Sequence, residues 1–417
     1  MQKQIHEPVA VPAHVPGHLV FDFDFFDPPG WAEDIQLAWK RLHDSAPDIF
    51  WTPRNGGHWV ATRGEDIREV QTNWRRFSQQ VMTIPAAAQT FRILPANADP
   101  PEHDFYRRII MPAFLPKVVD GIEAGIRELA HELIAGIAPR GACDFIEDFA
   151  RKLPIVTFLK FVDLPVSDRE QLVELSNAIM HGKDAAKAAE AQDAMTAYIA
   201  ALIEDRRRNP GGDVISSVVH ASIGERPIDE EEVWGLVRLI LFGGLDTLTA
   251  LVGFIWRFLA THPDHCHDLV EHPELRRNAV EELIRRHGVV NTARYVTEDC
   301  SYKGIALKRG DMIQIPNSLF GLDERITEDP LTVDFRREHV QHAAFGGGPH
   351  ICPGMWLARR EIEASLDAWL ELIPEFGLSP GTTPVLHAGA SNSGILRLEL
   401  AWGNGAGVPQ VNPVTRN

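Results

Sequence analysis

The segment Ala344–Arg360, AFGGGPHICPGMWLARR, holds the densest group of local signals in the chain. Its three consecutive glycines, 346–348, precede a proline and predict a bent loop, because glycine and proline both interrupt regular structure. Cys352 then stands directly before Pro353, and proline is favoured in the first turn of a helix. The free N–H groups and the dipole of that helix favour a thiolate at Cys352. The segment therefore predicts a cysteine that is a metal ligand or a nucleophile, with a purely structural cysteine as the alternative.

The surroundings of this cysteine favour a ligand over a nucleophile. His350 lies two residues before Cys352, but no neighbouring Asn or Asp is present to orient it as a base. The glycines indicate instead that the backbone approaches something large and flat. A zinc site at His265, Cys266 and His267 is excluded, because consecutive helical residues point in different directions and cannot close one tetrahedral site.

The composition is that of a globular protein with an acidic surface. Hydrophobic residues make up 44% and charged residues 24% of the 417 residues, and the net charge is -17. This charge disfavours nucleic acid and anionic membranes as partners, because both bind through Lys and Arg. The four cysteines show no paired spacing, which is typical of a reducing compartment. The start of the chain has no apolar core of a signal peptide, so we expect a cytoplasmic protein.

One segment is long and apolar enough to resemble a membrane span. Residues 239–256, LILFGGLDTLTALVGFIW, carry a single charge, Asp246, at their middle. Inserting that charge into a bilayer costs roughly 2.5–3.5 kcal/mol. The segment is therefore expected to be a helix buried on all sides in a large domain.

Hydrophobic periodicity predicts a mainly α protein with a small β portion. The helical segments are 117–137, 184–207, 230–260, 273–287 and 354–373. The strand candidates are 49–62 with a turn at Asn55–Gly56, 302–315 with a turn at Arg309–Gly310, and 394–400. We expect one domain over residues 20–402, an extended N-terminal arm over 1–19 and a loose C-terminal tail over 403–417.

The cysteine segment carries a family resemblance. Phe345, Gly348, His350, Cys352 and Gly354 stand at the fixed positions of the cysteine-ligand signature of the cytochrome P-450 family. The resemblance implies the single-domain fold of that family and haem b as cofactor. It also implies that Cys352 is the thiolate ligand of the haem iron and that Phe345, His350 and Gly354 contact the haem.

Glu282 and Arg285 share one face of a helix, which by itself predicts only a surface ion pair. In its place before the cysteine segment, the pair resembles the ExxR motif of the family. The resemblance implies that the pair is buried and that Arg337 completes it as a structural element.

The central helix contains Gly243, Gly244, Asp246 and Thr247. Buried Asp and Thr need hydrogen-bond partners, and a Thr hydroxyl bonded to a carbonyl of its own helix is the simple interpretation. The string resembles the oxygen-binding groove of the family. This implies that Gly243 borders the haem, and that Thr247 and Asp246 are catalytic residues that bind dioxygen and relay protons.

His103 and Arg107 lie four residues apart on one predicted helix face, which alone is compatible with a plain surface. The resemblance implies that they bind the two haem propionates, together with Arg294 and His350.

The closest subgroup is that of the bacterial camphor 5-monooxygenases. At the position of their substrate-binding tyrosine this chain has Phe91, which cannot donate a hydrogen bond to a ketone. Asn392 is the candidate for a relocated polar anchor. We therefore expect a small apolar terpenoid or norisoprenoid substrate resembling an ionone, with camphor or a related monoterpenoid as the alternative. The predicted pocket residues are Thr83, Phe91, Ala96, Leu239, Phe242, Val290, Ser391 and Asn392.

The resemblance further implies a monooxygenase that takes dioxygen, and electrons from a [2Fe–2S] ferredoxin with an NADH-dependent reductase. An acidic ferredoxin needs a local basic patch, for which the candidates are Arg107, Arg108, Arg336, Arg359 and Arg360. A haem-binding sensor or carrier without turnover is disfavoured by the presence of Asp246 and Thr247. A peroxide-driven peroxygenase is disfavoured for the same reason.

Overall fold

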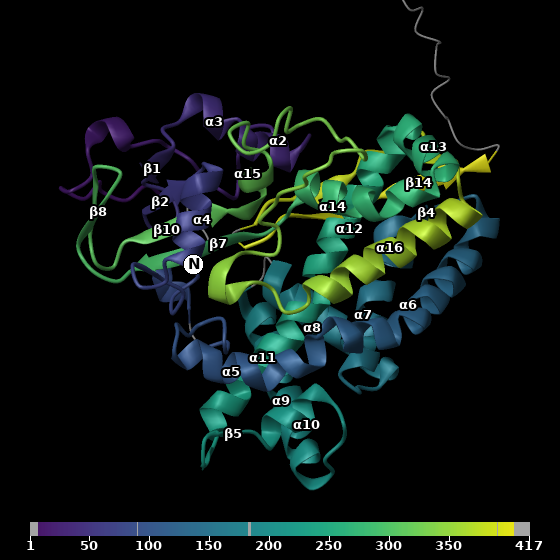
Figure 1. The fold of residues 1–417 in the computed structure, drawn as a ribbon, viewed down its shortest axis with the longest axis horizontal. Helices are drawn as coiled ribbons and strands as arrows, with labels where there is room; N and C mark the ends of the chain where they lie inside the picture. The colour runs from purple at the N-terminus through teal and green to yellow at the C-terminus, as the bar shows by residue number, and fades with distance from the viewer. Residues whose placement is uncertain (1–6, 90, 182–184, 390, 404–417) are drawn as a thin grey trace, which may run out of the picture.

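The computed structural model describes residues 7–89, 91–181, 185–389 and 391–403. A β-rich region, which includes the N-terminal part, lies at one end of the molecule, and long helices, with the strands β4 and β14 beside α13 and α16, occupy the rest (Figure 1). The mainly α architecture with a small β portion is as predicted. The α-helices are α2 Ile35–Lys40, α3 Leu42–Ser45, α4 Gly64–Thr72, α5 Glu102–Ile110, α6 Pro116–Ile137, α7 Lys152–Phe161, α8 Arg169–His181, α9 Ala185–Arg208, α10 Val214–Val219, α11 Glu230–Leu245, α12 Thr247–Thr261, α13 Pro263–Glu271, α14 Arg276–His287, α15 Asn317–Gly321 and α16 Met355–Leu372.

The strands form one sheet of five strands and several smaller pairings. The large sheet has the order β1-β2-β10-β7-β3, and β11-β14-β4 form a three-stranded sheet. The predicted hairpin at Asn55–Gly56 is present, with both residues at positive φ and Trp51 opposite Trp59. The strands are β1 Ile49–Thr52, β2 His58–Ala61, β3 Phe77–Ser78, β4 Ala142–Asp144, β5 Ser222–Ile223, β6 Arg226–Pro227, β7 Asn291–Val296, β8 Cys300–Tyr302, β9 Ile305–Leu307, β10 Met312–Pro316, β11 Phe376–Leu378, β12 Val385–His387, β13 Gly394–Arg397 and β14 Glu399–Trp402.

Two of the strand predictions need correction in detail. The chain does turn at Gly310, but β9 and β10 on either side of that turn belong to different sheets: β9 pairs with β8, and β10 pairs with β2 and β7. The single strand expected over 394–400 is divided at Leu398 into β13 and β14, which also join different sheets. Sequence alternation cannot reveal which strand becomes the partner, because pairing is decided by distant segments.

The long central helix is interrupted at Asp246, whose φ of -132° lies outside the helical region. This break separates two hydrophobic cores: Leu236 and Leu241 of α11 belong to one, and Ile255 and Trp256 of α12 belong to the other. By length and composition the segment Glu230–Thr261 could cross a membrane, and 59% of its most apolar window is buried inside the protein. Its all-round apolar character is therefore explained by burial in two cores.

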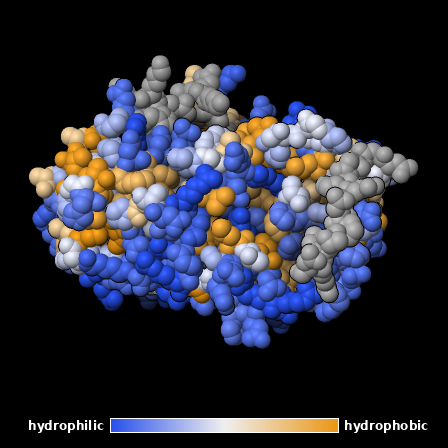
Figure 2. All heavy atoms as spheres, turned by 90° about the horizontal axis from the view of Figure 1, so that it is seen from above, coloured by the Kyte–Doolittle hydropathy of each residue, from blue (hydrophilic) through white to orange (hydrophobic). Residues whose placement is uncertain are grey.

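The described part of the N-terminal arm lies against the β-rich region. Val15 is buried, the Val9 N–H donates to the carbonyl of Pro53, and His14 contacts Asp311 at 3.0 Å. Residues 1–6 of the predicted arm and 404–417 of the predicted tail lie outside the described residues. On the face seen in Figure 2, hydrophilic residues predominate and hydrophobic ones form separate groups between them.

Candidate functional site

Cys352 lies on the loop that leads into α16. Its N–H donates to the carbonyl of Phe345 at 2.8 Å, which closes the loop upon itself. Burial raises the pKa of the Cys352 thiol. The backbone N–H groups of Gly354 and Met355 and the charge of Arg107 act in the opposite direction, because they favour the thiolate. The loop thus presents one sulfur atom to a set of groups that stabilise its anion.

The glycines of this loop are needed for two different structural reasons. Gly348 has a φ of +64°, and a Cβ there would lie 2.7 Å from the carbonyl oxygen of Gln71 on α4. A Cβ on Gly347 would lie 2.6 Å from the Gln71 side chain. These two glycines therefore serve packing against α4, contrary to the expectation that they serve a flat ligand. Gly354 is different, since a Cβ there would have only the Cys352 sulfur nearby, at 3.9 Å.

Four basic side chains from three segments converge beside this loop and are called the cationic cluster: His103, Arg107, Arg294 and His350. The rings of His103 and His350 are in edge contact, with centroids 4.6 Å apart. The Nε2 atoms of both rings are buried and have no hydrogen-bond partner among the described residues. Buried polar atoms are normally satisfied, so these two atoms point to a missing acceptor or donor.

The pKa values of the cluster reveal the same deficit of negative charge. Burial lowers the pKa of Arg294 to about 10, with Asp99 acting against it. Burial, together with the charges of Arg294, His103 and Arg107, lowers the pKa of His350 to about 2. Burial also lowers the pKa of Arg107. Buried cations are normally paired, so the cluster is suited to an anionic ligand.

A second buried charged group, the Glu282 triad, consists of Glu282, Arg285 and Arg337. Arg285 donates through Nε and Nη2 to the two carboxylate oxygens of Glu282, each at 2.7 Å, and both side chains are fully buried. Arg337 Nε lies 3.2 Å from the same carboxylate. Arg285 also donates to the carbonyls of Gly321 and Pro330. Here the protein itself satisfies every charge, so the triad fixes the segment around 321–337 against α14.

A cavity of about 360 Å³ lies between α11–α12 and the cysteine loop. Its walls are mostly apolar, as is usual for small-molecule sites. Nine residues predicted from the sequence line it: Leu239, Gly243, Thr247, Val290, Arg294, Phe345, His350, Cys352 and Gly354. Cys352 of the cysteine loop and Thr247 of α12 therefore line one shared space.

The glycine pair of α11 also divides into two roles. A Cβ on Gly243 would meet nothing within 4 Å, so this residue leaves open space at the cavity. A Cβ on Gly244 would lie 2.4 Å from the Phe158 ring, so this residue permits α11 to pack against α7. The Thr247 hydroxyl makes no hydrogen bond to a helix carbonyl within the described part of the chain, which removes the simple interpretation of this residue. Asp246 accepts a hydrogen bond from the Asn392 side chain at 2.8 Å.

The remaining predicted pocket residues are not among those that line this cavity. Phe91 and Phe242 stack with ring centroids 6.3 Å apart, and the Arg238 guanidinium lies over the Phe91 ring. Thr83 has a buried hydroxyl oxygen without a partner among the described residues. Ala96 is half-buried, Ser391 is exposed, and Asn392 is buried.

Several lining residues were missed by sequence reasoning. Leu248 and Leu251 follow Thr247 on the same helix, Leu251 one full turn later, so their position was accessible from helical spacing. Phe114 and Phe158 come from distant helices and carry no local signal. Glu361 on α16 also lines the cavity, is buried, and has an Oε1 atom without a partner in the described structure. Burial raises the pKa of Glu361 to about 8.

The proposed basic patch is largely neutralised by neighbouring carboxylates. Arg336 forms a two-pronged pair with Asp268, and Arg359 forms one with Glu281. Arg360 pairs with Asp120, Glu123 and Glu363, and Arg107 belongs to the cationic cluster. Arg108 is exposed and lies over the Phe105 ring. Near these arginines, Ile351 and Trp356 expose apolar surface beside the cysteine loop.

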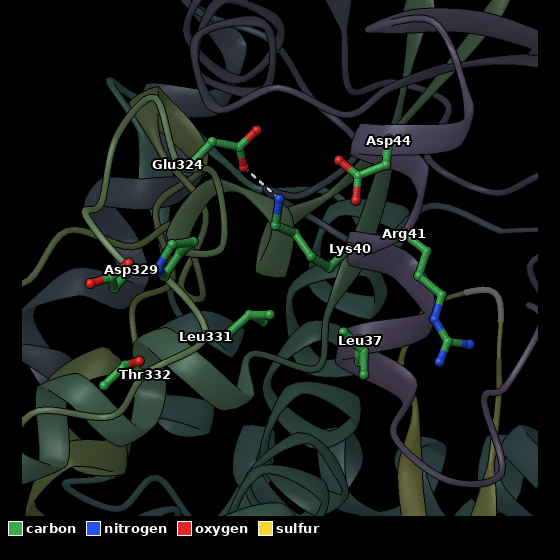
Figure 3. Close-up of a pocket in the computed structure, with 9 residues that line it drawn as sticks. Leu37, Lys40, Arg41, Asp44, Glu324, Asp329, Leu331 and Thr332 are labelled. Carbon is green, nitrogen blue, oxygen red and sulfur yellow. Dashed lines mark hydrogen bonds and ion pairs between the residues drawn. The ribbon is translucent and has the colours of Figure 1, made fainter. Parts of the chain in front are cut away.

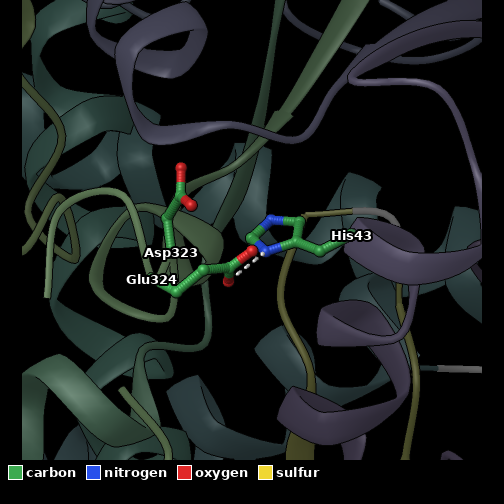
Figure 4. A group of neighbouring side chains, drawn as sticks. All are labelled: His43, Asp323 and Glu324. Carbon is green, nitrogen blue, oxygen red and sulfur yellow. Dashed lines mark ion pairs between the residues drawn. The ribbon is translucent and has the colours of Figure 1, made fainter. Parts of the chain in front are cut away.

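Two other places were considered as sites. A groove between α2 and residues 329–332 is crossed by an ion pair of Lys40 with Glu324 (Figure 3). His43, Asp323 and Glu324 come close enough to hold a metal ion (Figure 4). However, Arg63 already donates to both carboxylates at 3.2 Å and 2.7 Å. Both places are therefore held by ion pairs of the protein itself.

The comparisons with known proteins agree on one family. The family model for cytochrome P450 matches residues 155–385. The probable cytochrome P450 127A1 of Sinorhizobium fredii is 36% identical over 402 residues, which cover 94% of this chain and 97% of that relative. The crystal structures of CYP101J2 and CYP101C1 both superpose with a TM-score of 0.86, at 34% and 35% identity. They cover 95% and 94% of this chain and 100% of their own chains.

The fold and the cysteine site thus define a haem-thiolate oxidoreductase that incorporates oxygen. This chain belongs to the cytochrome P450 family, in the CYP101-like subgroup, and both the predicted family and the predicted subgroup are confirmed. The cofactor of the family is protoporphyrin IX haem.

The residues at the site fit that cofactor. Within the described residues the cluster has one carboxylate contact, between His103 Nδ1 and Asp104 at 3.0 Å, while the buried Nε2 atoms of His103 and His350 have no partner, which suits the two propionate groups of haem. The cavity beside it has Cys352 in one wall.

Proposed function

We propose that this P450 inserts one oxygen atom from dioxygen into an unactivated C–H bond of a small apolar terpenoid or norisoprenoid. When bound, haem supplies the oxidising chemistry, and the protein supplies binding, orientation and protons. The observation that carries the proposal is that Cys352 and Thr247 both line one mostly apolar cavity.

Cys352 is proposed as the thiolate ligand of the iron. The N–H groups of Gly354 and Met355 and the Arg107 charge favour the anionic sulfur that this role requires. The carbonyl oxygen of Phe345 accepts a hydrogen bond from the Cys352 N–H and so holds the loop in place. Gly243 and Gly354 keep the two walls free of side chains where the flat cofactor needs room.

The cationic cluster is proposed to bind the propionates. His103 and His350 each offer a buried Nε2, Arg294 offers a buried guanidinium, and Arg107 offers a half-buried one. An arriving carboxylate would gain charge-assisted hydrogen bonds, and the cluster would lose its uncompensated positive charge.

Thr247 and Asp246 are proposed as the residues that bind dioxygen and deliver protons. Thr247 lines the cavity, and its hydroxyl has no hydrogen bond to a helix carbonyl among the described residues, so it is available to donate to a ligand. Asp246 stands at the break between α11 and α12, next to Thr247 in the chain. A carboxylate in this place can exchange protons between the outside and the hydroxyl.

The substrate class is proposed from the apolar walls of the cavity. The cavity is lined by Leu239, Val290, Phe114 and Leu248. Phe91, which is not among the lining residues, stands where the resemblance to the camphor-hydroxylating members implies a hydrogen-bonding tyrosine. Losing a hydrogen bond to a buried ketone costs about 1–3 kcal/mol. Camphor and an ionone are both ketones and lose this bond alike, so the expected preference for the ionone rests on the larger apolar skeleton that it buries against these walls.

Electrons are proposed to come from a [2Fe–2S] ferredoxin and its NADH-dependent reductase, and the protein is proposed to be soluble and cytoplasmic. Because Arg336, Arg359 and Arg360 are paired with carboxylates, docking depends less on their charge than the sequence indicated. The exposed Trp356 and Ile351 beside Cys352 supply apolar contact. A weak dependence of the reduction rate on ionic strength is the expected result.

Three measurements test this proposal. Cys352→Ser should abolish the reduced carbon-monoxide spectrum that characterises the family, while the folded haem-loaded protein persists. Thr247→Ala should retain haem and substrate binding but divert reducing equivalents from product to peroxide. Titration of the ferric protein should give a larger high-spin shift with an ionone than with camphor. A full shift with camphor and none with the ionone would overturn the substrate class alone.

A further inference from the structure

Asn392 and Asp246 are 146 positions apart in the chain, and their side chains meet beside the cavity. The Asn392 Nδ2 donates to Asp246 Oδ2 at 2.8 Å, and Asn392 is 7% exposed. The bond joins a buried amide to a half-buried carboxylate, and a charge-assisted hydrogen bond is stronger than an ordinary one. Asn392 thus contacts the residue that is proposed to deliver protons.

Asp246 does not use its side chain in the way its position favours. It is the N-cap residue of α12, where an aspartate normally accepts a hydrogen bond from the second or third N–H of the helix. No such cap bond is formed here, and the carboxylate bonds Asn392 instead. The helix break therefore directs the carboxylate away from its own helix and toward the loop that carries Asn392.

Asn392 is fixed by its own backbone. It forms an isolated antiparallel bridge with Val290, which lines the cavity. The carbonyl of Ser391 accepts a hydrogen bond from the Asn291 N–H at 2.8 Å. A Cβ on Gly389 would lie 2.4 Å from the backbone carbonyl oxygen of Asn392, so Gly389 packs closely against the backbone of this residue. The amide is thus held in place before any ligand binds, as an effective positioning group must be.

We propose that Asn392 is a positioning residue for proton delivery, which holds the Asp246 carboxylate next to Thr247. This inference rests on the proposed proton-transfer role of Asp246. The amide neither gains nor loses a proton, so it acts only through Asp246. Its N–H donor favours the ionised carboxylate, which is the form that accepts the next proton from outside. One of the two amide N–H groups of Asn392 is engaged by Asp246, and Asn392 is not among the residues that line the cavity.

The test is a double-mutant cycle on the haem-loaded protein. Asn392→Leu removes the donor at similar volume, and Asp246→Asn removes the carboxylate. The two are also combined. Ser393→Ala, at a buried position one residue further along the same loop, is the matched control. The readouts are the rates of NADH and oxygen consumption with an ionone, a [2Fe–2S] ferredoxin and its reductase, measured in H2O and in D2O.

Asn392→Leu should slow oxygen consumption about three- to tenfold, a fraction of the hundredfold or more typical of a general acid–base group. The solvent isotope effect should rise, while the ionone dissociation constant stays within about twofold because the amide does not bind substrate. In the Asp246→Asn background the same change should have almost no further effect. Asn392→Asp places a second carboxylate against that of Asp246, and their repulsion should make oxygen consumption slower still.

A second readout does not depend on turnover. The thermal unfolding midpoints of the same haem-loaded proteins should be non-additive, because Asn392→Leu removes the donor of the hydrogen bond and Asp246→Asn removes the charge that strengthens the same bond. Two outcomes would overturn the positioning role of Asn392 only. In the first, Asn392→Leu slows oxygen consumption equally in the wild-type and the Asp246→Asn backgrounds. In the second, Asn392→Leu consumes oxygen at the normal rate although Asp246→Asn is slow. A normal rate in Asp246→Asn would overturn the proton-transfer role and this inference with it.

Discussion

The cationic cluster and the Glu282 triad are both buried and both rich in arginine, but they differ in how their charge is balanced. In the triad, Glu282 accepts from Arg285 and Arg337, and backbone carbonyls take the remaining donors. In the cluster, Arg294 donates to one backbone carbonyl, and the two histidine Nε2 atoms have no partner within the described residues.

This difference separates a structural charge group from a binding group. Burying charges is unfavourable unless they are paired, so a closed group such as the triad acts within the fold. An open group is tolerated where a ligand completes it. The pKa values follow this division: Arg285 and its neighbours outweigh the burial that raises the pKa of Glu282 and hold it below its ordinary value. Burial lowers the pKa of Arg294 to about 10.

The largest expected effect is that of opening the triad. Glu282→Gln leaves the fully buried Arg285 and the partly exposed Arg337 without their carboxylate, which should lower the free energy of unfolding by about 3–5 kcal/mol. Glu281→Gln on the same helix is the matched control. It breaks a partly exposed pair with Arg359 and should cost about 1 kcal/mol. Urea denaturation of both variants measures the two free energies of unfolding. Equal losses would contradict the view that the Glu282 triad is a closed structural group whose carboxylate is essential.

The opposite result is expected when the cluster loses a charge. Arg294→Met should leave the unfolding free energy of the haem-free protein unchanged or raise it, because an uncompensated buried cation is removed. The haem-loaded protein should release haem about tenfold faster, because a charge-assisted hydrogen bond to a carboxylate is lost. Transfer of haem to an apo-globin measures this rate. Arg397→Met, at an exposed position paired with Glu399, should change neither quantity.

The smallest effect concerns Glu361, a single buried acid that belongs to neither group. Burial raises its pKa to about 8 from an ordinary value of 4.5, so the folded protein binds this proton more tightly than the unfolded chain. The free energy of unfolding should therefore fall as the pH rises from about 4.5 to 8.

Glu361→Gln has no proton to lose and should become more stable relative to the wild type across this window, by about 1–2 kcal/mol. Thermal unfolding midpoints at several pH values measure the difference. Glu371→Gln, at an exposed position of the same helix, should show a constant offset. A constant offset for Glu361→Gln as well would contradict the raised pKa.

The helices were predictable because their signals are local. The segment expected over 117–137 is α6, and the one expected over 354–373 is α16. The strands were less predictable, since β9 and β10 follow one another but pair with different partners. Helical hydrogen bonds close within four residues, whereas sheet partners come from anywhere in the chain.

For the site, the sequence by itself determined the chemistry of single positions: the sulfur of Cys352, the carboxylate of Asp246 and the charge of Arg294. Only the tertiary structure decided their partners. It turned the Asn392 amide onto Asp246, neutralised Arg336 and Arg359 with carboxylates, and left the cationic cluster open. The physical reason is that a side chain's type is fixed by the sequence. Its burial, and the groups within hydrogen-bond reach of it, depend on segments that only folding brings together.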